Sequence, residues 1–540
     1  MQGLQRLFDQ FNRGWKSPKT ASLLITLGYF IGVGVALSQH EMCRDEIEAW
    51  LLARDSESIP QLFANLRNEG HPGLWYVLLM PLTRLSRSPQ LMQALHLVIA
   101  TLTVYLVSRY SPFTRLQSFL FPLGFYMAWQ YAVVSRDYAP GVLLLVMLCL
   151  LYERRYERFP LVGVILMLAA QTHALVMILV VTIGMALAVD VGVQFAQSRW
   201  DFGPKVRWQI ISGFGLIASG IIISLVQLIP DADYVGPTDS LARLLREHFF
   251  VIGLLALWGG GAFAFLLYVL RDRLSLVLLS GLAAIGIVLY FDASVLGAIA
   301  GAPGSKFFAF IGLVVYLFML YQLRYRLSLM LLYGLGTAGL LVWFSGVHSG
   351  GSHQHGLLFV VYVVAYWLET VTRSKSPDAL EGRGTRTADV LFALILISQS
   401  IFGVKALYDD LTTPYSNGKY VAQYIQSHGW QEWPIVGCTD FSAQTVVGYL
   451  GVDKIYYPQG ERWGSFIVWD KKRYENMGLD KCLESALALD HDLGRDVLVV
   501  SSYTKDSSLH ESQFRKVAEF VGALRDDENF VLYQSMAMAH

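Results

Sequence analysis

The sequence predicts a polytopic α-helical membrane protein that ends in a small α/β domain. Of its 540 residues, 54% are hydrophobic and 16% are charged, whereas a soluble domain carries about 25% charged residues. Apolar runs of roughly 18 or more residues recur up to residue 406 and are long enough to cross a bilayer. Within lipid, a helix satisfies its own backbone polar groups. The apolar runs shorten and charges return after that point, which divides the chain into a membrane domain, 1–406, and a second domain, 407–540.

Hydropathy places about thirteen helical spans in the membrane domain. A basic segment precedes the first apolar run, which is long for a signal sequence, so we expect it to remain as the first span. The spans are expected near residues 20–38, 91–108, 116–134, 140–153, 158–171, 174–193, 208–229, 249–270, 274–291, 306–322, 327–344, 357–371 and 388–406.

The connections between spans predict the orientation of the chain. Alternate loops, together with the N-terminal segment, are rich in Lys and Arg, which places them in the cytoplasm. The opposite loops are poorer in these residues, except that the first outer loop, 39–90, carries five Arg. Its apolar residues recur at helical spacing between charges, which predicts short amphipathic helices in the membrane interface, with arginines that meet lipid phosphates. The N-terminus is therefore expected in the cytoplasm and the second domain outside it.

Residues of catalytic type gather on the outer side. Ionisable residues beside membrane spans are candidates for function, and their one-sided grouping favours a site at the membrane surface over a path through the bilayer. We expect His173 to be a helix-end histidine and His96 to be structural. The outer residues are Asp45, Glu46, His71, Arg136, Asp137, His173, Lys306, His348, His353 and His355.

Three motifs in the first 175 residues resemble one family of membrane enzymes. An Asp-Glu pair in "CRDEIEAW" follows the first span, "GHPGLWY" covers 70–76, and "SRDYAP" covers 135–140. In this order, and with interfacial helices between them, they resemble the GT-C superfamily of integral-membrane glycosyltransferases. The protein O-mannosyltransferase and lipid A aminoarabinose transferase branches are the most similar type. Those enzymes often have "GHPP" where this chain has "GHPG", and the rest of the chain is similar only in layout.

The resemblance implies transfer of a sugar from a polyprenyl-phosphate carrier to an acceptor hydroxyl on the non-cytoplasmic face. Asp45 is then the base that accepts the hydroxyl proton, and Glu46 orients it or takes its place. The phosphate and the rest of the substrate are expected to contact His71, Arg136, Asp137, Lys306, His353 and His355. Arginine offers a fork of donors that matches phosphate oxygens.

A divalent metal ion, Mg or Mn, is a candidate cofactor between Asp45 and Asp137, because facing carboxylates suit such ions. The other expected partners are the lipid bilayer and a glycan, lipid or protein acceptor. The formal net charge is zero, so nothing draws the chain to nucleic acid. No Gly-rich phosphate loop stands between a strand and a helix, which agrees with a lipid-linked donor. A bacterial inner membrane and a role in envelope glycan synthesis follow from this reading.

Simpler explanations remain open for each motif. Asp45 and Glu46 suit an ordinary helix start, since acidic groups stabilise helix N-termini. Arg136 and Asp137 suit a local ion pair, and "HSGGSHQH" at 348–355 suits a flexible turn. Two other classes also use many helices. A transporter or lipid flippase is expected to show an inverted repeat or charges at mid-membrane, and a membrane acyltransferase normally takes its donor from the cytoplasm.

The second domain, 407–540, shows alternating strand and helix patterns. "PIVGCTD", "KIYYP", "DVLVVSS" and "NFVLYQS" predict strands. "GKYVAQYIQSH", "SAQTVVGYL", "CLESALAL" and "QFRKVAEFVGAL" predict helices. The alternation predicts a mainly parallel sheet that covers the active site or helps to bind the acceptor. Cys438 and Cys482 both lie here, and spacing alone leaves open whether they pair.

Overall fold

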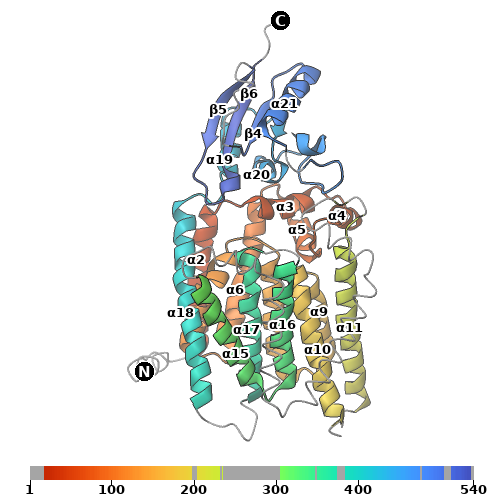
Figure 1. Ribbon diagram of the computed structural model, residues 1–540, viewed down its shortest axis with the longest axis vertical. Helices are drawn as coiled ribbons and strands as arrows, with labels where there is room; N and C mark the ends of the chain where they lie inside the picture. The colour runs from red at the N-terminus through yellow and green to blue at the C-terminus, as the bar shows by residue number, and fades with distance from the viewer. Residues whose placement is uncertain are drawn as a thin grey trace.

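A long helical bundle carries a sheet domain at one end (Figure 1). The computed structural model describes residues 18–196, 203–231, 234, 305–346, 350–373, 383–474, 477–503 and 513–536. Within these ranges, seven helices are long and apolar enough to cross a membrane, and three shorter apolar helices accompany them. The polytopic helical class is therefore confirmed, while the spans expected over 249–270 and 274–291 fall outside the described residues.

The bundle helices follow the predicted spans closely. Their bounds are α2 (Pro18–Gln39), α6 (Gln90–Tyr110), α8 (Tyr138–Leu151), α9 (Phe159–Ala170), α10 (Ala174–Ala196), α11 (Pro204–Leu228), α15 (Ser305–Leu323), α16 (Leu327–Gly346), α17 (Ser352–Arg373) and α18 (Arg383–Thr412). The helix expected over 158–171 and the one expected over 174–193 are separate, so the break around His173 is confirmed. Helices from the first and last parts of the bundle, α2 and α18, pack against each other.

The continuous helix expected over 116–134 is wrong. This segment forms α7 (Arg115–Leu120), a 3₁₀ turn η1 (Phe121–Leu123) and a π-helical turn η2 (Tyr126–Gln130). Pro122 and Gly124 interrupt the helix, and Gly403 of α18 lies so close to the backbone of Leu123 that a side chain at Gly403 has no room. Irregular backbone is tolerated at membrane depth where protein covers it, and α18 provides that cover.

The first outer loop forms the expected short helices, α3 (Arg44–Arg54), α4 (Ile59–Asn65) and α5 (Leu74–Leu85). Their surroundings differ from the expectation, because Ile47, Trp50 and Leu51 of α3 are fully buried. They belong to one apolar core with residues of α5 and of the C-terminal domain. In Figure 1, α3 and α5 lie at the end of the bundle, directly beneath that domain.

The five arginines of this loop, which were expected to meet lipid phosphates, bind other groups of the protein. Each has a partner within the chain, and that partner explains the basic loop without invoking lipid. Arg44 pairs with Asp527, Arg54 with Asp55, Arg67 with Asp231 and Arg87 with Asp453, while Arg84 donates to the carbonyl oxygens of Arg54 and Ser56.

The C-terminal domain holds a mixed sheet with the strand order β3-β2-β1-β4-β6-β5. β1 is parallel to β2 and β4, whereas the other three neighbouring pairs are antiparallel, so the expectation of a mainly parallel sheet is wrong. The strands are β1 (Ile435–Gly437), β2 (Ile455–Tyr457), β3 (Arg462–Gly464), β4 (Leu498–Ser501), β5 (Phe514–Phe520) and β6 (Phe530–Ser535). The helices are α19 (Gly418–Ser427), α20 (Asp440–Leu450) and α21 (Leu479–Leu493).

β5 replaces a helix that the sequence predicted over 513–524. Its apolar residues fit a helical pattern, but β6 is buried along most of its length and needs a second neighbour beside β4. β5 supplies it by antiparallel pairing, with a register shift between Lys516 and Ala518. Gly522, at φ +86°, lies in the connection to β6. Long-range strand pairing therefore outweighed the local helical pattern.

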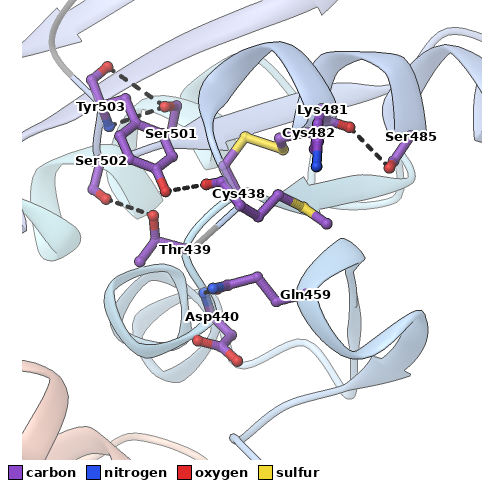
Figure 2. Close-up of a disulfide and its surroundings, with 11 residues drawn as sticks. Cys438, Thr439, Asp440, Gln459, Lys481, Cys482, Ser485, Ser501, Ser502 and Tyr503 are labelled. Atoms are coloured by element: carbon purple, nitrogen blue, oxygen red, sulfur yellow. Dashed lines mark hydrogen bonds between the residues drawn. A yellow bond between two sulfur atoms is a disulfide. The ribbon is translucent and has the colours of Figure 1, made fainter. Parts of the chain in front are cut away.

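Cys438 and Cys482 form a disulfide (Figure 2), with Cα atoms 5.4 Å apart and a separation of 44 positions in sequence. Cys438 directly follows β1, and Cys482 lies in α21. The bond therefore fastens α21 to the sheet, and it resolves the pairing that the sequence left open.

Candidate active site

Asp45 lies in the first turn of α3, at the end of the bundle that faces the C-terminal domain. Its side chain is 28% exposed. Oδ2 accepts a hydrogen bond from Nη1 of Arg136 at 3.0 Å, and Nε of Arg44 lies 3.5 Å from Oδ1. The carboxylate therefore faces two guanidinium groups while one edge stays accessible.

Arg136 links Asp45 to a third residue. The same Nη1 lies 3.1 Å from Nε2 of His353, which is in the first turn of α17. Arg136 itself lies in the turn before α8, and its guanidinium also stacks on the ring of Tyr138 at 5.6 Å. Side chains from three distant segments of the chain thus meet at one point.

The charges at this point fix the ionisation of Asp45. Burial acts to raise its pKa, but Arg136, Arg44 and Arg525 outweigh burial and hold the pKa well below its usual range. Burial acts to lower the pKa of Arg136, and the neighbouring Asp45 raises it instead. Asp45 is therefore an ionised carboxylate whose ion pair with Arg136 makes it a weak base. Any group that draws Arg136 away raises the pKa of Asp45 and makes it a stronger base.

Glu46 points away from Asp45 and is fully buried. Oε1 accepts a hydrogen bond from the Ser135 amide at 2.7 Å, and Oε2 accepts one from the Cys43 amide at 3.0 Å. Nε2 of His40 lies 3.2 Å from Oε2. With both oxygens engaged, Glu46 holds the start of α3 against the turn that carries Arg136, so it is a positioning residue.

His40 completes this buried contact and was not singled out from the sequence. Its Nδ1 lies 2.9 Å from Oδ1 of Asp410, near the end of α18. Burial acts to lower the pKa of His40, yet Glu46 and Asp410 raise it to about 10. The signal available in the sequence was a histidine directly after an apolar span and close to two glutamates.

His71, Asp137 and His173 form a second group next to Arg136. One ligand atom from each lies within 4.8 Å of the others, and the described residues contain no other such group of three or more. Nδ1 of His71 is 3.4 Å from Oδ2 of Asp137, and the rings of His71 and His173 are 4.8 Å apart. Burial raises the pKa of Asp137, against the opposing effect of His71 and Arg136.

This grouping differs from the metal site expected from the sequence. Asp137 was expected to face Asp45, but it lies with two histidines, while Asp45 pairs with Arg136. His173 is the helix-end residue that was expected, because its Nδ1 accepts the Leu175 amide at 3.0 Å. Sequence spacing gave no sign that it also joins His71 and Asp137.

The remaining predicted residues are dispersed. The ring of His355 packs edge-on against Phe344, with centroids 4.7 Å apart. His96 is structural, as expected, since its nitrogens face the carbonyl oxygens of Ala132 and Arg136 at 2.9 and 3.1 Å. The side chain of Lys306 and all of His348 lie outside the described residues.

Two further carboxyl groups near Asp45 were missed from the sequence. Glu48 lies one helical turn after Asp45, and burial together with Asp45 and Asp440 raises its pKa to about 8. Burial and the nearby Glu48 also raise the pKa of Glu69. The available signal for Glu48 was its position three residues after Asp45, on the same face of a helix. That spacing is equally typical of a solvated helix face.

The C-terminal domain holds the start of α3 from above. The Arg44 amide donates to Oε1 of Glu528 at 2.6 Å, and the Arg44 guanidinium pairs with Asp527 and stacks on Phe441 at 4.6 Å. Asp440, which follows β1, forms an ion pair with Arg473 at 2.7 Å, so its carboxylate is engaged inside the C-terminal domain. The residue before Asp45 thus anchors the domain beside the candidate base.

Comparison with known proteins gives one finding at the level of structure. No family model and no curated protein matches the chain. The structure is similar to a crystal structure of ArnT from Cupriavidus metallidurans in the apo state, with 13% identity and a TM-score of 0.47, over 95% of this chain and 98% of that one. A likeness of this degree does not say which reaction this chain catalyses.

Proposed function

We propose that this protein is a membrane glycosyltransferase that moves a sugar from a polyprenyl-phosphate carrier to an acceptor hydroxyl. The observation that carries the proposal is the contact of an ionised Asp45 with Arg136, and of Arg136 with His353, at one end of a polytopic bundle. The acceptor is a glycan, a lipid or a protein.

The chemistry follows from an exchange of partners by Arg136. The donor phosphate competes with Asp45 for the guanidinium, because arginine binds phosphate through two parallel hydrogen bonds. Once Arg136 turns to the phosphate, the pKa of Asp45 rises and its carboxylate becomes a better proton acceptor. The base is therefore strengthened by the arrival of the donor.

In the transfer step, Asp45 takes the proton of the acceptor hydroxyl as its oxygen bonds to C1 of the sugar. The bond between C1 and the phosphate oxygen breaks, and the electron pair leaves with the carrier phosphate. Arg136 stabilises the negative charge that develops there, and His353, 3.1 Å from the same guanidinium nitrogen, keeps Arg136 in place.

Two observations support a site on the non-cytoplasmic side. Disulfides persist in oxidising compartments, and Cys438 and Cys482 form one in the domain above the site. The positive-inside rule, applied to the alternate loops rich in Lys and Arg, favours the cytoplasm for them. We therefore propose a bacterial inner membrane, with the N-terminus in the cytoplasm and the C-terminal domain outside.

Transfer from a synthetic donor tests the proposal. The purified full-length protein is incubated with a labelled polyprenyl-phosphate sugar, and released carrier phosphate and glycosylated acceptor are measured. We expect Asp45→Asn to lower turnover by about 10²–10⁴-fold, the usual worth of a general base. Asp492→Asn, on an exposed aspartate of α21, is the matched control. Turnover unchanged in Asp45→Asn contradicts the proposal, and transport of the lipid across vesicles by that variant favours a flippase.

A further inference from the structure

The corner formed by His71, Asp137 and His173 has the residue types of a metal site. The nitrogen of His173 that faces this corner, however, carries a proton. His173 precedes α10, and its carbonyl accepts the Met177 amide at 3.0 Å, the first bond of the helix. Its Nδ1 accepts the Leu175 amide, also at 3.0 Å. Since a backbone amide can only donate, this Nδ1 carries a lone pair and no proton.

A neutral imidazole has one proton, so Nε2 of His173 must hold it. A histidine that binds a metal uses a bare nitrogen and keeps its proton on the other one, where it donates to a second group. His173 has the opposite arrangement: the helix start occupies Nδ1, and Nε2 faces the corner as a donor. It therefore offers an N–H group to the corner, where a metal ion requires a lone pair.

The remaining two groups make a poor site for a divalent ion. Catalytic zinc usually keeps three protein ligands, and without His173 this corner supplies only His71 and Asp137. Magnesium and manganese prefer oxygen ligands, and Asp137 is the one carboxylate in the group. The residues of this corner, which include Asp137 of the site expected from the sequence, therefore do not fit a divalent metal ion.

A hydroxyl group fits the corner better. Among the described residues, Oδ2 of Asp137 and Nε2 of His173 are buried and form no hydrogen bond, although Oδ2 also lies 3.4 Å from Nδ1 of His71 as an ion pair. The two residues are 5% and 2% exposed. One group is an acceptor and the other a donor, and the two residues each have a ligand atom within 4.8 Å of the other's. An oxygen about 2.8 Å from both, at ordinary hydrogen-bond length, spans that separation with a nearly tetrahedral angle.

We propose that Asp137 and His173 bind one hydroxyl oxygen between them, which donates to the carboxylate and accepts from the imidazole, and that no divalent metal ion binds here. The hydroxyl belongs either to the donor sugar or to a bound water molecule. The sugar as its source rests on the proposed function, whereas the exclusion of a metal does not. His71, at 25% exposure, is the more accessible member of the group.

A high-resolution cryo-EM map of the full-length protein tests the proposal directly, after incubation with zinc or manganese and removal of the free ion. We expect density about 2.8 Å from both Asp137 Oδ2 and His173 Nε2, and less than about 0.1 metal ion per chain by mass spectrometry. Density about 2.0–2.2 Å from all three ligands, with one metal ion per chain, overturns the proposal. So does a corner with no density.

A second map with a polyprenyl-phosphate sugar bound separates the two sources of the hydroxyl. Density joined to the sugar identifies a substrate hydroxyl, and an isolated peak in both maps identifies water. Neither map requires turnover, so failure of the proposed transfer reaction is distinguishable from failure of this inference.

Two variants of His173 add a kinetic test. His173→Gln keeps an N–H donor near the position of Nε2, while His173→Leu removes it. If the sugar supplies the hydroxyl, His173→Leu raises KM about 10-fold or more, the worth of one lost hydrogen bond, and His173→Gln recovers most of it. If His173→Leu changes neither KM nor the melting temperature, a bound hydroxyl of either source is contradicted. If His173→Gln does not recover KM, while added zinc restores the activity of the wild type, His173 is favoured as a metal ligand.

Discussion

At the scale of single residues, the site depends on how Arg136 divides its donors. One guanidinium nitrogen contacts both Asp45 and His353, so the proposed base keeps a low pKa until another anion binds the arginine. Sequence spacing could not show this, because 91 and 217 residues separate the partners. The charge of the loops predicted only that these residues share one face.

Removal of Arg136 tests this restraint. In Arg136→Gln we expect turnover to fall by about 10²–10³-fold, as when one donor to a developing anion is lost. The pKa of Asp45 then rises towards its ordinary value, since its strongest opposing charge is gone. The acidic limb of the pH–rate profile should therefore move to higher pH. Arg67→Gln, which breaks an exposed pair with Asp231, is the control, and an unmoved acidic limb in Arg136→Gln contradicts the assignment.

Glu48 provides a second test at this scale. Its pKa is about 8 in the folded protein against an ordinary value of 4.5, so the folded state favours the protonated form. Its ionisation therefore costs stability that grows as pH rises from 4.5 and levels off above 8. We expect Glu48→Gln to raise the melting temperature at pH 8.5 and to leave it almost unchanged at pH 5. Equal melting temperatures at pH 8.5 contradict the burial of this carboxyl group.

At the scale of elements, the start of α3 is held by a buried chain of groups from Ser135 through Glu46 and His40 to Asp410. It connects the first outer loop, the turn before α8 and the end of α18. Asp45 directly precedes Glu46 in α3, so its position depends on three parts of the bundle.

Substitution of His40 should expose this dependence. His40→Phe leaves two buried carboxylates without their cation, and breaking such a pair costs about 3–5 kcal/mol. The folded pKa of His40, about 10, exceeds its ordinary value of 6.5. Its contribution is therefore complete below pH 6.5 and is lost as pH rises through 10. Melting in detergent, followed by tryptophan fluorescence, should show this loss in the wild type and in His491→Gln, an exposed control. The loss should be absent in His40→Phe.

The elements also show where sequence reasoning succeeds and fails. α2 and α6 were predicted within two residues, because lipid imposes one requirement on every residue of a span. The helix over 116–134 failed because Pro122 and close packing against Gly403 outweigh its hydropathy. β5 failed because its conformation is decided by β6, a neighbour that local pattern does not reveal.

At the scale of the whole molecule, the C-terminal domain shares a core with α3 and α5. Arg44 and Arg87 of the first outer loop serve this contact through ion pairs with Asp527 and Asp453. Charge counting assigned them to lipid because a sequence does not show which domain will lie above a loop.

The disulfide is the natural place to test how far this domain supports the site. Replacing Cys438 and Cys482 by serine removes a link that closes a loop of 44 residues, and such links usually contribute about 2–4 kcal/mol. We expect the variant to melt earlier and its domain to be cut faster by protease. Dithiothreitol should reproduce both effects in the wild type and add nothing in the variant. An effect of the reductant on the variant contradicts this explanation.

The contact of His40 with Asp410 also sets an order of events during synthesis. The two residues are 370 positions apart, and a ribosome adding about 5–20 residues per second needs roughly 20–70 s to cover that distance. Until Asp410 has been made, His40 has only Glu46 of its two carboxylate partners. The buried contact that holds the start of α3 therefore forms only after α18 has been made.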